Sequence, residues 1–191
     1  MLRVLIIDES RNRAAELCAG LAMAGHQVAA IVPSAFDLSA QIEALKPDII
    51  LIETDSPSRD TLENLAVMDR EMPRPVIIFA QEGDSSTIRE AVKAGVAAYV
   101  VDGLESSRLK PVIDVAIARF EEHQLLKREL ADATRKLSER KTVEKAKGIL
   151  MKTRGLDEES AYVALRKLAM ERARPIGSVA QDLIDMAKLL L

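Results

Sequence analysis

The first half of the chain alternates between short apolar runs and longer segments with helical spacing. Continuous runs rich in Val, Ile and Leu predict five β-strands, at residues 3–7, 27–32, 48–52, 76–80 and 98–101. Between them, apolar residues that recur every three or four positions predict helices over 11–24, 35–46, 58–71 and 85–94. Because the strands are apolar throughout, both faces of their sheet should be covered by helices. The pattern therefore predicts an α/β fold around a doubly wound parallel sheet.

The second half of the chain is predicted to be helical. A long helix should begin near Glu105, and leucine or alanine at positions 126, 130, 133 and 137 follows the 4-3-4 spacing of a short coiled-coil seam. We expect part of this helix to pair with another chain, although a solvated linker helix would show the same spacing. Three short helices should follow: one over Arg140–Met151, one capped by Asp157 and one capped by Ser178.

Charge divides the chain in a different way from hydrophobicity. Residues 1–111 contain 11 Lys and Arg against 17 Asp and Glu, whereas residues 135–174 contain 12 against 6. The basic segment is therefore the part expected to meet a polyanion. A single cysteine, the lack of a membrane-length apolar run and the lack of a signal-peptide pattern predict a cytoplasmic protein that does not enter the membrane.

Acidic residues follow several of the predicted strands. Since the carboxyl ends of parallel strands share one edge of the sheet, these residues should lie together there. Carboxylates so placed are able to bind Mg²⁺, and solvated acidic loops are the alternative. The sequence has no nucleophile elbow, phosphate-cradling glycine loop or Cys/His metal spacing, so we expect no enzymatic activity and no required cofactor. The residues predicted to form this edge pocket are Asp8, Glu9, Glu53, Asp55, Ala80 and Asp102.

Residues 1–119 resemble the receiver domain of two-component response regulators, which has a flavodoxin-like fold. The resemblance rests on the segment 47–53 followed by Pro57, on Asp8-Glu9, and on Ala94-Gly95 with Tyr99. This chain departs from the receiver pattern at three positions, because Glu53 replaces the phosphoacceptor aspartate, Ala80 the switch Thr or Ser, and Asp102 the lysine. Phosphoryl transfer needs a correctly placed acceptor and a cation, so we expect a degenerate receiver without phosphorylation-driven switching. Asp55 as a displaced acceptor is the alternative.

Residues 140–191 resemble an ANTAR domain, the RNA-binding output module of antiterminator regulators. The matching positions are Arg140, 143–151, Gly155, Ala161-Tyr162, Leu165-Arg166, Ala169-Met170 and Val179-Ala180. On the first tail helix, Arg140, Glu144, Lys147 and Met151 fall on one stripe, and we expect Lys147→Ala to lower RNA affinity at nearly constant stability. For Tyr162, core packing is favoured over base stacking. The predicted RNA-binding residues are Arg140, Lys141, Lys147, Gly148, Lys152, Arg166 and Arg172.

The whole chain is similar to the nitrate-responsive NasT-type antiterminators. That resemblance implies a receiver-like domain over 1–119, a coiled-coil linker over 120–139 and the ANTAR domain over 140–191. It also implies a homodimer that binds paired hairpins in leader mRNA, controlled by a nitrate/nitrite-sensing partner protein. The alternatives are a phosphorylation-switched, DNA-binding response regulator and an interaction adaptor without affinity for nucleic acid. We expect RNA rather than DNA as the ligand.

Overall fold

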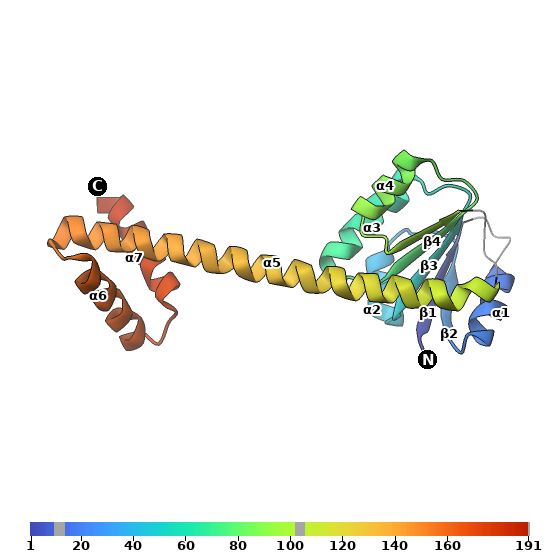
Figure 1. Cartoon of the computed structure of the whole chain (residues 1–191), viewed down its shortest axis with the longest axis horizontal. Coiled ribbons are helices and arrows are strands. Elements are labelled where there is room, and N and C mark those ends of the chain that lie inside the picture. The colour runs from blue at the N-terminus through green and yellow to red at the C-terminus, as the bar shows by residue number, and fades with distance from the viewer. Residues whose placement is uncertain (10–13, 102–105, 191) are drawn as a thin grey trace. The chain divides into compact units, whose positions relative to one another are not determined.

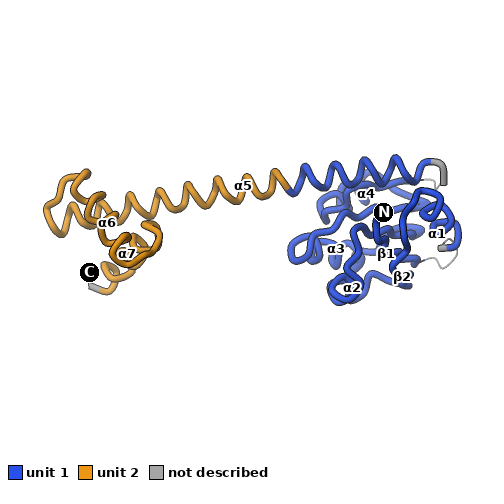
Figure 2. The backbone as a smooth tube through the Cα atoms, turned by 90° about the horizontal axis from the view of Figure 1, so that it is seen from below, with its two compact units in different colours: residues 1–124 blue, residues 125–191 orange. Residues whose placement is uncertain are grey.

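A computed structural model describes residues 1–9, 14–101 and 106–190. They form two compact units, the front unit over residues 1–124 and the tail unit over residues 125–191 (Figure 2). The long helix α5, Ser106–Arg154, contributes residues to both units.

The front unit is built on a five-stranded parallel sheet in the order β2-β1-β3-β4-β5 (Figure 1). The strands are β1 (Arg3–Asp8), β2 (Gln27–Val32), β3 (Ile49–Thr54), β4 (Val76–Ala80) and β5 (Ala98–Val101). The helices between them are α1 (Ala14–Met23), α2 (Leu38–Leu45), α3 (Arg59–Glu71) and α4 (Ser85–Lys93). This order is that of the flavodoxin-like fold, so the predicted fold class is confirmed.

Alternating residues of each central strand face two separate cores. In β1, Val4 and Ile6 pack with side chains from α1 and α5, whereas Leu5 and Ile7 pack with side chains from α2, α3 and α4. β3 is buried at all six positions. The continuous apolar strands seen in the sequence are thus explained by helices on both faces of the sheet.

Two helix starts differ from the prediction. α2 begins at Leu38 rather than near Ala35, because Asp37 takes a left-handed conformation with φ of 52° and Phe36 turns its side chain to the surface. α7, Ile176–Leu190, begins ahead of the predicted cap at Ser178. The Ser178 N–H instead donates to the carbonyl of Pro175 at 3.0 Å, as a residue of the first turn does.

The tail unit contains the end of α5, then α6 (Glu158–Glu171) and α7. α5 continues without a break to Arg154, so the predicted coil and the first tail helix are one helix; Gly155, with φ of 63°, follows it. The small core of this unit has a central cluster of Val143, Ala146, Leu165, Ala180 and Ile184, and Ala161, Ala169 and Val179 are buried as well. On the coil part of α5, Leu126, Leu130 and Leu137 are each more than half exposed in the single chain. No helix in the described parts of the chain is long and apolar enough to cross a membrane.

Candidate nucleic-acid interface

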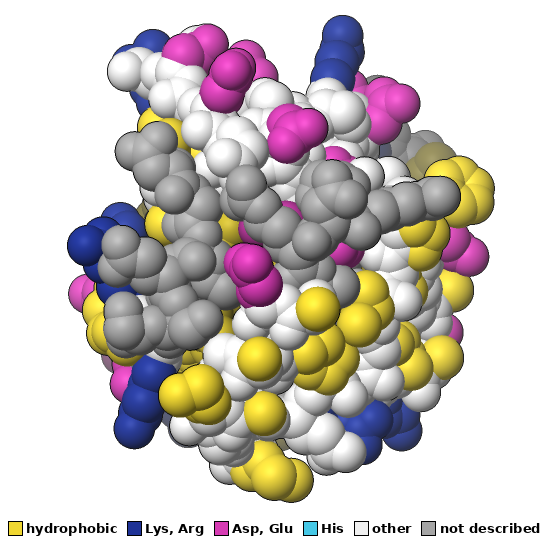
Figure 3. Space-filling view, turned by 90° about the vertical axis from the view of Figure 1, so that its right-hand side faces the viewer, with side chains coloured by type: hydrophobic (Ala, Val, Ile, Leu, Met, Phe, Trp, Pro, Cys, Tyr) yellow, Lys and Arg dark blue, Asp and Glu magenta, His cyan; other side chains and the backbone are white. Residues whose placement is uncertain are grey.

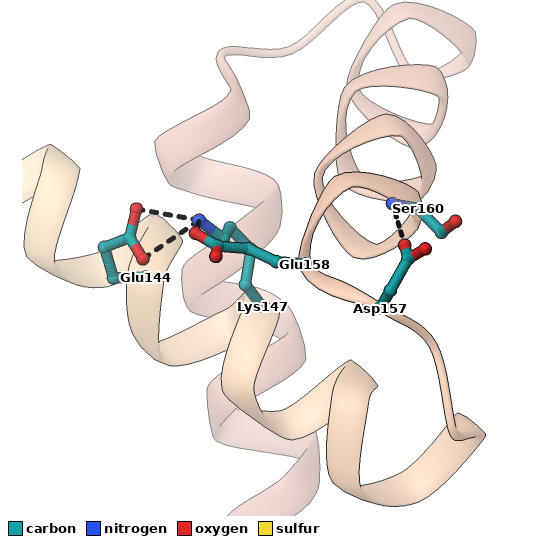
Figure 4. Close-up of polar contacts among 5 residues, drawn as sticks. All are labelled: Glu144, Lys147, Asp157, Glu158 and Ser160. Carbon is teal, nitrogen blue, oxygen red and sulfur yellow. Dashed lines mark hydrogen bonds and ion pairs between the residues drawn. The ribbon is translucent and has the colours of Figure 1, made fainter.

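Lys147 is buried in the tail unit and not displayed on its surface. Only 7% of the residue is exposed, because it lies beside Ala146 on the side of α5 that faces the core. Its Nζ donates to Glu144 Oε1 at 2.9 Å and Oε2 at 3.0 Å, and to Glu158 Oε1 at 2.7 Å (Figure 4). These hydrogen bonds, to Glu158 first and then to Glu144, raise the pKa of Lys147 above its ordinary value.

This cluster, which we call the Lys147 clamp, joins two helices of the tail. Glu144 lies one turn before Lys147 on α5, whereas Glu158 lies in the first turn of α6. The Lys147 ammonium holds the pKa of Glu158 below its ordinary value through the hydrogen bond between them. Lys147 therefore positions the start of α6 against α5, and a variant without it should lose stability. The sequence-based expectation of constant stability does not fit this burial.

The start of α6 is also fixed by its own cap. Asp157 has an extended backbone, and its carboxylate accepts a hydrogen bond from the Ser160 N–H at 2.7 Å (Figure 4). The hydrogen bonds from Ser160 lower the pKa of Asp157. The predicted cap is thus in place, and α6 is held at its first turn by two independent contacts.

The other predicted cationic contacts of the tail are at the surface. Arg140, Lys141 and Lys152 on α5 are exposed, as are Arg166 on α6 and Arg172 at its end. These five positively charged side chains are therefore available for contact with a polyanion.

The outer face of α6 combines an aromatic ring with a guanidinium and a thioether. Tyr162 is 45% exposed and Met170 73% exposed, and Arg166 lies between them at a spacing of four residues, which places all three on one side of the helix. The core contacts of α6 come from Ala161, Leu165 and Ala169 instead. Packing of Tyr162 in the core, the interpretation favoured from the sequence, is therefore wrong.

A basic groove lies between α5 and α7 in the tail. Its volume is about 760 Å³, and its lining includes Arg140, Lys141, Lys145 and Lys188 over an apolar floor with Leu137 and Ile184. Lys145 and Lys188 were not among the predicted contacts. The sequence could have indicated Lys145, because it is a charged position beside the apolar face of its helix. It could not have indicated Lys188, because the position of that residue depends on how α7 packs along α5.

The acidic pocket of the front unit lies where β1 and β3 end. Asp8 pairs with Glu53 in the strand register, and the two are only 3% and 1% exposed. The Glu9 N–H donates to the Glu53 carbonyl at 3.0 Å, and the Thr61 hydroxyl of α3 donates to Glu9 Oε1 at 2.9 Å. The structure thus brings together three of the predicted pocket residues.

The remaining pocket residues differ in their surroundings. Ala80 is fully buried at the end of β4, and Asp55 is exposed. Asp102 lies outside the described residues. Figure 3 shows acidic side chains on this face of the front unit beside the undescribed atoms.

The acidic pocket is the possible Mg²⁺ site that the sequence indicated. No group of three or more His, Cys, Asp or Glu side chains within residues 1–9, 14–101 and 106–190 could hold a metal ion.

Comparison with known proteins identifies the two parts. Residues 131–191 match the family model of the ANTAR domain. The transcriptional regulatory protein PdtaR of Mycobacterium tuberculosis is 27% identical over 183 residues, which cover 96% of this chain and 89% of that protein. The nitrate regulatory protein of Klebsiella oxytoca is 36% identical over 80 residues, which cover 42% of this chain and 20% of that protein.

The front unit resembles solved receiver structures. The signal receiver domain of a modulated diguanylate cyclase from Desulfovibrio desulfuricans G20 has a TM-score of 0.56 at 22% identity, and the match covers 64% of this chain and 98% of that one. At this identity the likeness shows the fold alone. The chain thus carries a domain of receiver fold followed by an ANTAR domain, and the resemblance seen in its sequence is confirmed.

Proposed function

We propose that this ANTAR-domain regulator is a non-enzymatic, RNA-binding transcription antiterminator. A dimer would bind paired hairpins in a nascent leader mRNA and so disfavour the terminator hairpin. The observation that supports this most directly is the coincidence of two features in one part of the chain. The ANTAR match covers residues 131–191, and the same residues carry most of the exposed arginines and lysines of the tail unit.

The outer face of α6 has the side chains that single-stranded RNA requires. Bases in hairpin loops are unstacked, and proteins read them by stacking on aromatic rings and guanidinium planes. Tyr162 and Arg166 offer both kinds of surface, one turn apart. We therefore assign loop-base contacts to this face and phosphate contacts to the exposed lysines and arginines.

The coil part of α5 supports a homodimer. Leu126, Leu130 and Leu137 are more than half exposed, although their spacing is that of a seam that packs against a second helix. A second copy of the chain would cover them and would place two ANTAR domains on one RNA, which suits a target with two hairpins.

The front unit would then control the activity of the regulator and would not take part in phosphoryl transfer. Glu53 and Ala80 stand where receivers have an acceptor aspartate and a switch hydroxyl, and both are buried. We propose that the front unit docks a nitrate/nitrite-sensing protein, which sequesters the regulator until ligand is present. The similarity of the chain to the nitrate regulatory protein supports nitrate or nitrite assimilation genes as the targets.

A gel-shift experiment tests the RNA-binding proposal. The probe is a tandem-hairpin leader RNA recovered by crosslinking the protein to cellular RNA and sequencing the bound transcripts. At physiological salt we expect this RNA to bind far more tightly than a single hairpin or duplex DNA of equal length. Equal affinity for the DNA would overturn the proposal, and equal affinity for the single hairpin would overturn paired-hairpin recognition.

Variants on α6 and on the coil make the same experiment residue-specific. Arg166→Ala should weaken RNA binding by a factor of about 5 to 150, since loss of one stacked base costs about 1–3 kcal/mol. Arg128→Ala, which removes an exposed arginine from the coil part of α5, is the matched control and should leave binding unchanged. Both variants should keep the melting temperature of the unaltered protein.

A further inference from the structure

Three exposed lysines and one glycine form a stripe along α5 in the tail unit. Lys141, Lys145, Gly148 and Lys152 are spaced 4-3-4, so they lie on one side of the helix, away from the buried Val143 and Ala146. We call this set the α5 lysine stripe. It shares no residue with the stripe predicted from the sequence, Arg140, Glu144, Lys147 and Met151, of which the structure buries Lys147.

No contact within the described chain explains why residue 148 of this stripe is a glycine. A glycine within a helix lowers helix stability relative to alanine. Its φ is not in the left-handed range, and a Cβ added to it would meet nothing within 4 Å. By contrast, a Cβ on Gly83 would come within 2.8 Å of Tyr99, and one on Gly95 within 2.6 Å of Asp69. Neither packing nor backbone conformation therefore requires glycine at position 148, which leaves contact with another molecule.

We infer that the sugar–phosphate backbone of the bound RNA lies along the α5 lysine stripe and comes closest to the helix at Gly148. This inference rests on the proposed function and assigns a part of it to one surface. The three ammonium groups would pair with successive phosphates, and the missing side chain would let the RNA strand approach the helix backbone between Lys145 and Lys152. Such contacts orient the RNA without reading its sequence.

Charge argues against a second copy of this chain as the occupant. The apolar seam of the coil ends at Leu137, and its 4-3-4 spacing continues through Arg140, Glu144 and Lys147, which are charged. A two-fold related copy would bring the lysines of both stripes together and would repel. A polyanion, in contrast, is complementary in charge to three exposed lysines that surround Gly148, a helix position without a side chain.

Gly148→Ala tests the inference because stability and binding should change in opposite directions. The variant has room for its methyl group and a better helix former, so its melting temperature should rise. Its RNA affinity should fall several-fold, because the added Cβ separates the strand from the helix. Target and non-target hairpins should lose affinity by the same factor, since no base is read here.

The lysines provide a second, independent readout. Replacing Lys141, Lys145 and Lys152 by alanine should reduce the steepness of log K against log salt by about 0.7–0.9 for each phosphate that is no longer neutralised. Arg128→Ala, on the exposed coil part of the same helix and outside the ANTAR match, is the matched control and should leave the slope unchanged. Far-UV circular dichroism checks that every variant keeps its helices.

The outcomes separate this inference from the proposed function. If the unaltered protein binds no hairpin RNA, the proposed function fails and the stripe with it. If it binds RNA but Gly148→Ala binds equally well and the lysine variants keep the salt slope, the stripe alone is overturned. A change in the oligomeric mass of Gly148→Ala in sedimentation, at unchanged RNA affinity, would also overturn the inference and would make this face a contact between two chains.

Discussion

The front and tail units differ in what holds them together. The front unit has two apolar cores, one on each face of a five-stranded sheet, with strand β3 buried along its whole length. Among its described residues, the tail buries eight hydrophobic side chains, six of which are alanine or valine. It adds the Lys147 clamp and the Asp157 cap, both at the start of α6.

This difference indicates how each unit should respond to substitution. A small core gives only a small free energy of unfolding, so a tail of this size depends on each interaction that orders its helices. The front unit can tolerate truncation of one apolar side chain and stay folded. Charged side chains of the tail therefore differ in role. Lys147 holds two helices together, whereas exposed lysines such as Lys145 and Lys152 are available for the proposed RNA contacts.

The largest expected effect comes from matched deletions in the two cores. Leu65→Ala in the front unit and Leu165→Ala in the tail each remove a leucine that is at most 1% exposed. Each should lower the free energy of unfolding by about 2–5 kcal/mol. Hydrogen exchange should show that α6 and α7 lose protection in Leu165→Ala, while the strands stay protected in Leu65→Ala.

Val163→Ala is the control on α6, because Val163 is 56% exposed and should tolerate truncation. Equal loss of protection in both units after the two leucine deletions would show that the tail is as robust as the sheet. The proposed difference in robustness between the two units would then be wrong.

An intermediate effect is expected for Lys147→Met, which keeps most of the side-chain length but removes the cation. Glu144 and Glu158 would then face each other without the ammonium between them. The melting temperature of the tail should fall, and RNA binding should weaken because the start of α6 is no longer held. Lys152→Met changes the net charge equally at an exposed position and should leave the melting temperature unchanged.

The clamp also predicts how tail stability depends on pH. The pKa of Glu158 is lowered from its ordinary value of 4.5, so its contribution is present above that value and is lost as pH falls through the lowered pKa. The pKa of Lys147 is raised from 10.5, so its contribution is present below that value and is lost as pH rises through the raised pKa. The free energy of unfolding, measured with urea, should therefore fall less between pH 7 and pH 3 in Lys147→Met than in the unaltered protein. An identical pH profile would argue against the clamp.

The smallest expected effect is in the front unit. Incubation with acetyl phosphate and Mg²⁺ should leave the intact mass of the protein unchanged, because Glu53 is one methylene longer than the aspartate that receivers phosphorylate. A receiver domain that accepts phosphate from the same reagent is the positive control. A stable phosphoryl adduct on this chain, on Asp55 for example, would show that the front unit has kept its chemistry.

The fold of the front unit could be predicted from its sequence because one physical signal dominates it. A strand buried on both faces must be apolar at every position, and β1, β3 and β4 meet that condition over most of their length. The start of α2 could not be predicted in the same way. Phe36 fits an apolar helix face by its spacing, but the left-handed turn at Asp37 exposes it.

The site in the tail was predicted less well because its charges look alike in sequence. Lys147 and Lys145 are two positions apart in one basic segment, and only the approach of α6 makes the first a buried partner of Glu158. Tyr162 was misjudged for a related reason. The core face of α6 is narrow and uses Ala161, Leu165 and Ala169, so a large aromatic residue next to it is left at the surface.

The capped start of α6 has a consequence for the direction in which RNA can lie. The N-terminal end of a helix normally attracts phosphate through its free N–H groups and its positive dipole. Here the Asp157 carboxylate already occupies the Ser160 N–H, and Glu158 and Glu159 add negative charge in the same turn. If RNA binds along the lysines as proposed, this acidic end would disfavour phosphates. We therefore expect a bound strand to run away from the start of α6 rather than across it.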